Sequence, residues 1–148
     1  MSPSASQNQI ALAGLLNLNI AADTYDVAAA RLLDAVAEAI GHEPPEQSSE
    51  RQRAVATSLG HDVSVDSKRV ASAKIGEALF AKNQDAITSL GLKPGDRVIR
   101  VERFEYDGEM RTLEQEFVIS SIQPTGRVFF QGGNGQGAWP TQLKKITG

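Results

Sequence analysis

No cysteine occurs among the 148 residues, which excludes disulfides, cysteine-ligated zinc sites and cysteine nucleophiles. Aromatic residues make up only 5% of the chain, so the core must consist mainly of alanine, leucine, valine and isoleucine. Apolar residues make up 41% and charged residues 22%, a composition typical of a folded protein. The length suits one ordinary domain or two small ones.

Long apolar segments are missing as well. No run approaches the roughly 20 residues that a membrane-spanning helix needs, so we expect no membrane partner. Residues 1–6 include no basic region followed by an apolar stretch, and therefore do not resemble a signal peptide. These absences favour a cytoplasmic protein of bacterial or phage type.

Sequence motifs of common enzymes are also absent. The glycine-rich segment 132–137 is followed by Ala138 and Trp139, and neither a phosphate-binding loop nor a dinucleotide site continues in this way. His42 and His61 are not spaced as a metal-ligand pair. The acidic residues between positions 102 and 116 fit the solvated face of a hairpin better than a pair of hydrolytic carboxylates. We expect no enzyme activity, no cofactor and no metal.

The most informative feature is an internal repeat with an offset of 43 residues. Nine identities occur over the 28 ungapped positions that begin at residue 9. Among the matches, Asp23-Thr24 aligns with Asp66-Ser67. Because such side chains accept hydrogen bonds from the first amides of a helix, both pairs predict a helix start.

Each copy is predicted to form a helix, a short extended turn and a second helix. Short helices are expected over residues 8–17 and 50–59, and a longer helix should follow each capping pair. Ile20 and Val63 are expected to anchor the two turns in the core. A single copy can hardly bury its own apolar face, so we expect the two copies to pack against each other.

After residue 91 the pattern changes from the helical period to the strand period. The turn at residues 93–96 has proline and glycine where type II geometry needs them, and Asp107-Gly108 is a strong hairpin signal. Four or five short strands with tight turns predict a small antiparallel barrel, and the fold class is α+β. We expect a disordered N-terminus over residues 1–6, a helical domain of four to five helices over residues 7–91 and a β-barrel over residues 92–148. Within the helical domain, the two repeats should span residues 7–41 and 49–82, with a linker over residues 42–48.

Two family resemblances follow from these residues. Gln52, Leu59-Gly60 and the segment 70–75 resemble SAP-like helix-extended-helix modules, which implies a role in binding DNA. The first copy departs from this pattern at two positions, with Asn17 in place of the glycine and Ala29 in place of the serine. The second resemblance concerns the C-terminal part, in which the segment 94–98 and the closing Trp139 with its following apolar residues resemble an SH3-like barrel. That layout implies a binding module but no particular ligand.

Charge is distributed unevenly along the chain. Residues 1–50 carry one cation and seven acidic residues, whereas residues 51–148 carry 14 cations and 11 acidic residues. A local basic patch in the second part would suit phosphate contacts, and the single tryptophan could stack on a base or fill the core. The candidate nucleic-acid-binding residues are Arg51, Arg53, Lys68, Arg69, Lys74, Arg97, Arg100, Arg127, Trp139, Lys144 and Lys145.

The sequence therefore predicts a non-enzymatic accessory protein that binds DNA or RNA. The alternative is an adaptor that binds another protein, or an accessory factor of a mobile element, through its acidic first repeat. An exposed apolar patch within residues 10–36 favours the protein partner, and a cationic groove near residues 51–74 favours nucleic acid.

Overall fold

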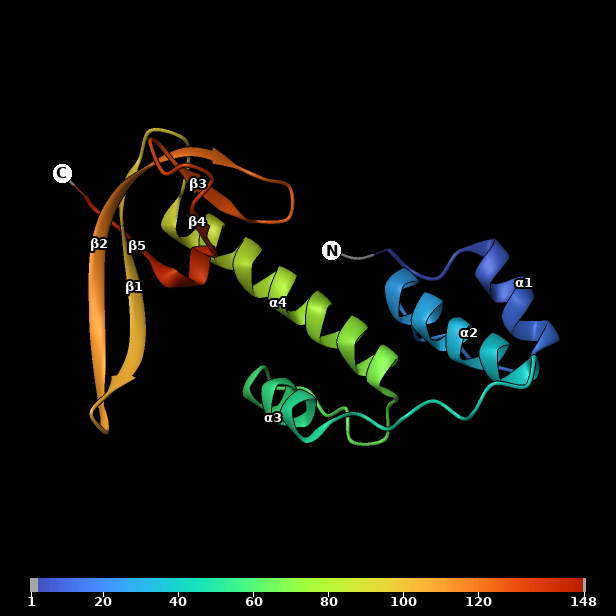
Figure 1. Ribbon diagram of the computed structural model, residues 1–148. Coiled ribbons are helices and arrows are strands. Elements are labelled where there is room, and N and C mark those ends of the chain that lie inside the picture. Colours follow the sequence, from blue (N-terminus) through green and yellow to red (C-terminus); the bar gives the residue numbers. More distant parts are fainter. Residues whose placement is uncertain (1–2, 148) are drawn as a thin grey trace. The chain divides into compact units, whose positions relative to one another are not determined.

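The computed structural model describes residues 3–147, and it has an α+β fold (Figure 1). Four helices are followed by a five-stranded antiparallel sheet. The chain forms two compact units, residues 1–79 and 80–148, and the fourth helix belongs partly to each. Within the described residues, no helix is both long enough and apolar enough to cross a membrane.

The helices repeat with the same offset as the sequence. Helix α1 (Gln7–Leu15) and α3 (Glu50–Ser58) begin 43 residues apart, as do α2 (Tyr25–Ala39) and α4 (Lys68–Leu90). The predicted helical domain, residues 7–91, has four helices and no separate fifth helix over residues 83–91. Helix α4 continues to Leu90, because neither glycine nor proline occurs in it after Gly76.

The start of each copy is held by the same set of hydrogen bonds. Ser6 caps α1 by accepting from the Gln9 amide, and its own amide donates to the Gln9 side chain at 2.9 Å. The Gln9 side chain also donates to the carbonyl of Tyr25 at 3.0 Å, which ties α1 to the start of α2. The second copy makes these bonds through the residues 43 positions later, Ser49, Gln52 and Lys68. Ser6 thus has a structural role within the segment predicted to be disordered, of which residues 1–2 lie outside the described part.

The turns after α1 and α3 are also equivalent. Gly60 has a φ of 81°, and Asn17 at the matching position has a φ of 54°. Asparagine is one of the few residues other than glycine that adopt this left-handed conformation readily. The substitution of asparagine for glycine in the first copy therefore leaves the turn unchanged, and Ile20 and Val63 are buried below the two turns as expected.

Each copy has a small core of its own. The cluster in the first copy consists of Ala13, Ile20, Ala28 and Leu32. The cluster in the second copy has its members at the matching positions, with Ile75 half-buried: Ala56, Val63, Ala71 and Ile75. The alanines allow the two helices of a copy to approach closely, which explains why so alanine-rich a sequence can form a packed unit.

The two copies pack against each other through α2 and α4. Val27 and Ala30 of the first copy are buried with Val70 of the second. Around this contact, the Thr24 hydroxyl donates to the Glu77 carboxylate, and the Ser67 hydroxyl donates to Asp34.

These two hydrogen bonds are the same contact made twice. The 43-residue offset relates Thr24 to Ser67 and Asp34 to Glu77, so each copy donates to the other from an equivalent position. Such reciprocity is the signature of a two-fold axis. The helical unit is therefore an internal pseudo-dimer, in which α2 and α4 lie across the local axis.

The sheet has the strand order β4-β3-β2-β1-β5. Its elements are β1 (Arg97–Tyr106), β2 (Glu109–Ile122), β3 (Val128–Phe130), β4 (Gly137–Ala138), the 3-10 helix η1 (Pro140–Gln142) and β5 (Leu143–Lys145). The predicted closed barrel is not confirmed. The edge strands β4 and β5 have only two and three residues and do not pair with each other, so the sheet stays open.

The hairpin of β1 and β2 dominates the sheet. The predicted hairpin turn is confirmed: Asp107 and Gly108 both have positive φ, at 53° and 76°, as a type I′ turn requires. The two strand segments expected over residues 110–113 and 117–122 are one continuous strand, β2. The far part of this hairpin extends beyond the other strands (Figure 1), and we call its residues 101–116 the hairpin arm.

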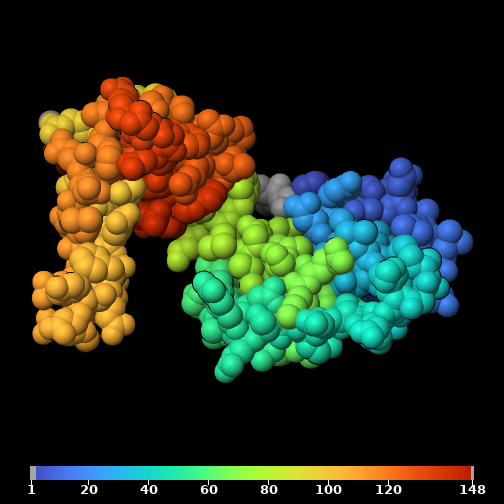
Figure 2. Space-filling view, in the orientation of Figure 1, coloured from blue at the N-terminus to red at the C-terminus, as the bar shows by residue number. Residues whose placement is uncertain are grey.

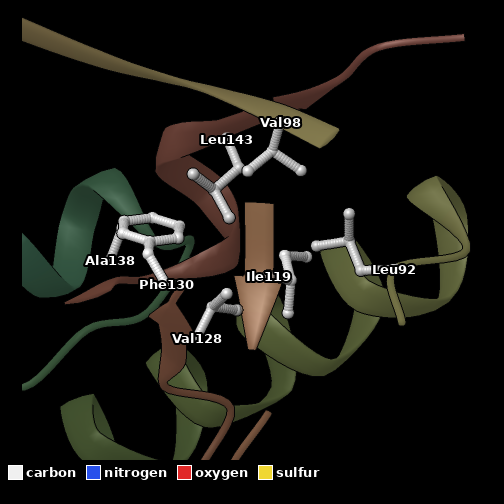
Figure 3. Close-up of a cluster of buried hydrophobic side chains, with 7 residues drawn as sticks. All are labelled: Leu92, Val98, Ile119, Val128, Phe130, Ala138 and Leu143. Carbon is white, nitrogen blue, oxygen red and sulfur yellow. The ribbon is translucent and has the colours of Figure 1, made fainter. Parts of the chain in front are cut away.

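The core of the sheet unit lies at the near end of the hairpin. Figure 3 shows seven buried side chains that meet there from the strands and the segment after α4: Leu92, Val98, Ile119, Val128, Phe130, Ala138 and Leu143. Ile87 and Leu90, on the last turns of α4, pack against this cluster, and the Phe117 ring stacks on Phe130 at 4.2 Å. The end of α4 therefore belongs to the core of the sheet unit.

Candidate binding surfaces

Most cations predicted for the second repeat are neutralised by neighbouring acids. Lys74 contacts Asp66 at 2.8 Å, and Arg69 contacts Asp34 at 3.1 Å. Lys68 contacts Glu46 at 2.5 Å. The charges of these three cations are therefore largely neutralised by acids of the helical unit.

The ion pair of Lys74 with Asp66 has a counterpart in the first repeat. Arg31 contacts Asp23 at 2.8 Å, as Lys74 contacts Asp66. The hydrogen bond that Arg31 donates to the Asp23 carboxylate raises the pKa of Arg31 above its ordinary value. Similarly, the hydrogen bond from Lys68 lowers the pKa of Glu46 below its ordinary value. The aspartates that sequence analysis placed among the helix caps thus act mainly as ion-pair partners, and the hydroxyls of Thr24 and Ser67 cap the helices.

Arg51 and Arg53 differ from the other cations of the second repeat. Within residues 3–147 neither has an acidic group within ion-pair distance, although Arg53 donates a hydrogen bond to the Ser48 carbonyl. Arg51 lies on a groove of about 220 Å³ between α3 and α4. The groove is lined by Ser49, Arg51, Gln52, Val55, Ser72 and Ile75. It includes Gln52, Ser72 and Ile75 from the segment that carries the SAP-like resemblance.

In the sheet unit the predicted cations do not form one groove. Four of them are paired with acids: Arg97 with Glu116, Arg100 with Glu102 at 3.2 Å, Lys144 with Glu114 at 3.8 Å, and Lys145 with Asp96 at 3.3 Å. Arg100 also lies over the Phe117 ring at 5.1 Å, and is partly used in covering the core.

Arg127 and Trp139 are the two predicted site residues of the sheet unit that the structure brings together. The guanidinium of Arg127 lies 5.2 Å from the centre of the Trp139 ring, within cation–π range. Trp139 is 38% exposed, and its amide donates to the Gln142 side chain at 2.9 Å. One face of this ring is therefore covered by a cation, and the ring lies outside the buried cluster.

The first repeat has exposed apolar side chains within residues 10–36, the region where an apolar patch was expected to favour a protein partner. Ile10 of α1 is 51% exposed, and four other large side chains of α1 and α2 are 38–84% exposed: Leu12, Leu15, Tyr25 and Leu33. We call these last four residues the apolar face. Tyr25 and Leu33 lie eight residues apart on α2, which places them about 80° apart around the helix, within one broad apolar stripe.

The second repeat shows that the fold does not need this apolar face. Its residues at the matching positions are Val55, Ser58, Lys68 and Gly76. Because Ser58 and Lys68 occupy the same places in the same scaffold as Leu15 and Tyr25, polar residues are compatible with the fold there. A position-by-position comparison of the two copies could have revealed the face from the sequence.

The hairpin arm carries a second exposed apolar surface. Phe104 and Leu113 are 43% and 44% exposed, while Tyr106 and Met110 reach 61% and 69%. Figure 2 shows the arm as a narrow projection of the sheet unit. Arg111 lies 5.0 Å from the centre of the Tyr106 ring. Where the arm meets η1 and β5, a groove of about 680 Å³ is lined by Arg103, Glu114 and Lys144, among others.

No group of three or more histidine, aspartate or glutamate side chains within residues 3–147 is placed to hold a metal ion. Comparison with models of protein families, with curated proteins and with solved structures finds no match to this chain. The geometry of the surfaces is therefore the basis for a functional proposal.

Proposed function

We propose that the protein is a non-enzymatic adaptor whose first helical repeat binds another protein through the apolar face. The observation that carries this proposal is the contrast between the two repeats. Leu15 and Tyr25 are exposed where the same scaffold holds Ser58 and Lys68 in the second copy. Exposed apolar side chains that stability does not require are typical of an interaction surface.

The surroundings of the apolar face suggest the charge of its partner. Residues 1–50 have a single cation, Arg31, and this cation is paired with Asp23. Of the other acidic side chains in the first repeat, Asp26 and Glu38 form no ion pair within the described residues, and they give this repeat a net negative surface. A partner with a basic rim and an apolar core would be complementary to it, since electrostatic complementarity favours association.

The two repeats supply matched variants for a test. Replacing Leu15 by serine and Tyr25 by lysine converts two positions of the apolar face to the residues of the second repeat. We expect this double variant to melt like the wild type and to lose specific protein partners in a quantitative affinity capture from cells that express the chain. Capture of the same proteins in the same amounts by both forms would contradict the proposal.

A second candidate function is nucleic-acid binding by the second repeat. It is favoured by the same comparison, because Arg51, Arg53 and Lys68 stand where the first repeat has Asn8, Ile10 and Tyr25. Arg51 and Arg53 also remain without an acidic partner among the described residues. We propose on this basis that the SAP-like resemblance of the second repeat reflects contact with DNA or RNA phosphates.

Fluorescence anisotropy with short DNA and RNA at two salt concentrations tests this second candidate. Binding through these cations should weaken as salt rises, because phosphate contacts release counterions. The Arg51→Asn and Arg53→Ile double variant, which introduces the residues of the first repeat, should weaken it further. The Leu15→Ser and Tyr25→Lys variant serves as the control. Absence of binding at low salt would eliminate this candidate and leave the adaptor proposal unaffected.

The sheet unit also fits a binding role. We propose that it is a variant of the SH3-like layout, supported by its strand order β4-β3-β2-β1-β5 and by the 3-10 helix before β5. Trp139 with Arg127 offers a flat surface for a ligand at this end of the chain. Under this proposal the cytoplasmic, phage-type or mobile-element setting expected from the sequence remains a prediction.

A further inference from the structure

The outer part of β1 is an open strand edge. Strand β5 pairs only with Val98–Arg100 of β1, whereas β1 pairs with β2 along its whole length to Tyr106. No other strand within the described residues pairs with the outer side of residues 101–106. The 3-10 helix η1 lies beside the inner end of this edge, near Val101, but in the described part of the chain it forms no backbone hydrogen bond with the edge. From Arg103 outward, the backbone amides and carbonyls on this side are free to pair with another strand.

The direction of these backbone groups can be read from the inner part of β1. The Ile146 amide donates to the Arg97 carbonyl at 2.9 Å, so the backbone groups of Arg97 point to the β5 side. The register with β2 is unbroken from Arg97 to Tyr106. Alternation along the strand then directs the backbone groups of Arg103 and Glu105 to the same, open side.

Two charged side chains on this edge have no ion-pair partner within the described residues. Among the charged residues of β1, Arg103 and Glu105 form no ion pair within residues 3–147. Phe104 lies between them on the opposite face, with Tyr106. Proline and bulges, which commonly protect an open edge, are absent from this segment.

We propose that this edge pairs with the same edge of a second copy of the chain, antiparallel and centred on Phe104. In this register Arg103 lies opposite Glu105 of the second copy, and Glu105 lies opposite Arg103. Both pairs consist of residues whose backbone groups point outward, so each exchanges its N–H and C=O groups across the new junction. Phe104 then faces Phe104 of the second copy as a close, non-hydrogen-bonded pair.

The charge pattern explains why the partner is a second copy. When two copies of one strand pair antiparallel, the central residue lies opposite itself. Every other residue lies opposite the residue at the same distance on the other side of the centre. Centring on Phe104 matches both unpaired charges with opposite charges, whereas centring on Arg103 places Glu105 opposite Val101. Nucleic acid is a poor occupant, because residues 101–116 carry two cations and six acidic residues.

The proposed dimer rests on the open edge of β1 and does not depend on the adaptor proposal. If both hold, dimerisation adds a second binding surface. A dimer joined through the hairpin arms carries two apolar faces. Such a dimer binds a partner with repeated sites more tightly than one chain does.

A cysteine crosslink tests the register directly, because the chain has no cysteine of its own. Residues in a non-hydrogen-bonded pair have Cα atoms about 4.5 Å apart, which a disulfide can bridge. We expect the Phe104→Cys variant to form a covalent dimer under mild oxidation. The Thr112→Cys variant, with an equally exposed thiol on β2, should remain monomeric. A covalent dimer in both variants, or in neither, would overturn the proposed register.

Charge inversion provides the second measurement, by analytical ultracentrifugation of the full chain over a range of concentrations. The Arg103→Glu variant should weaken the dimer by about tenfold or more, because both ion pairs become repulsive. Adding Glu105→Arg restores opposite charges and should restore the dimer. The Glu109→Arg and Arg111→Glu swap on β2 should change nothing. A wild type that stays monomeric at millimolar concentration, or an Arg103→Glu variant that dimerises as the wild type does, would overturn the proposal; neither result bears on capture of a partner by the apolar face.

Discussion

Replacing Ile119 by alanine is expected to lower the free energy of unfolding by about 2–5 kcal/mol, because the side chain is fully buried and its loss leaves a cavity. Ile119 lies among six other buried side chains at the near end of the hairpin (Figure 3). The single tryptophan, Trp139, belongs to the sheet unit, so urea unfolding followed by its fluorescence measures the effect.

The same strand supplies the control for this substitution. Leu113 lies on β2, six residues before Ile119, and is 44% exposed. We expect Leu113→Ala to change the free energy of unfolding by less than about 0.5 kcal/mol, as surface substitutions usually do. Equal losses for the two variants would mean that the hairpin arm is part of the core, and would contradict its description as a free surface.

Replacing Val70 by aspartate is expected to disrupt the contact between the two repeats, with a loss of about 3 kcal/mol or more at neutral pH. Val70 is 2% exposed and packs against Val27 and Ala30 of the first copy. A carboxylate there has no described cation to pair with in this apolar cluster. Urea unfolding followed by circular dichroism at helical wavelengths measures the loss.

The pH dependence of this loss identifies its cause. Burial raises the pKa of the introduced carboxyl in the folded state above its value in the unfolded chain. The folded protein is therefore least affected at pH values below the unfolded pKa, and stability falls as the pH rises through the folded pKa. The Val70→Asn control should cost a similar amount at every pH. A pH-independent loss for Val70→Asp would show that the site is hydrated and that the repeats do not share a dry contact.

The sequence predicts much of the helical unit because local signals and the repeat agree. The capping pairs at Thr24 and Ser67, the turn residues Ile20 and Val63, and the offset of 43 residues are all confirmed in the structure. The reciprocal contacts of Asp34 and Glu77 could not be predicted, because they depend on how two copies meet in space and not on any local pattern.

The sheet was predicted less completely for a related reason. The Asp107-Gly108 turn is encoded locally, and it is confirmed. Closure of a barrel depends on whether the edge strands are long enough to reach each other, and β4 and β5 are too short. The reach of the hairpin arm could not be predicted either, because residues 114–116 are all polar and show no alternation that would indicate a continuous β2.

The candidate binding residues show the limit of reading charge from sequence. A cation such as Lys74 looks available in a linear sequence, yet Asp66, eight residues earlier in the turn before α4, forms an ion pair with it. Conversely, Leu15 and Tyr25 look like ordinary core residues, because apolar side chains are normally buried. Only the comparison of equivalent positions in the two copies separates the residues that the scaffold requires from those it merely tolerates.

The measurement that tests the adaptor proposal most directly is calorimetric titration of a captured partner into the wild type and into the Leu15→Ser and Tyr25→Lys variant at several temperatures. The proposal predicts a negative heat-capacity change for the wild type, because apolar surface is buried on binding. It also predicts at least about tenfold weaker binding by the variant, since both replaced side chains would lie at the centre of the interface. Equal affinity for the two forms would contradict the proposal and show that the apolar face of the first repeat is not the docking site.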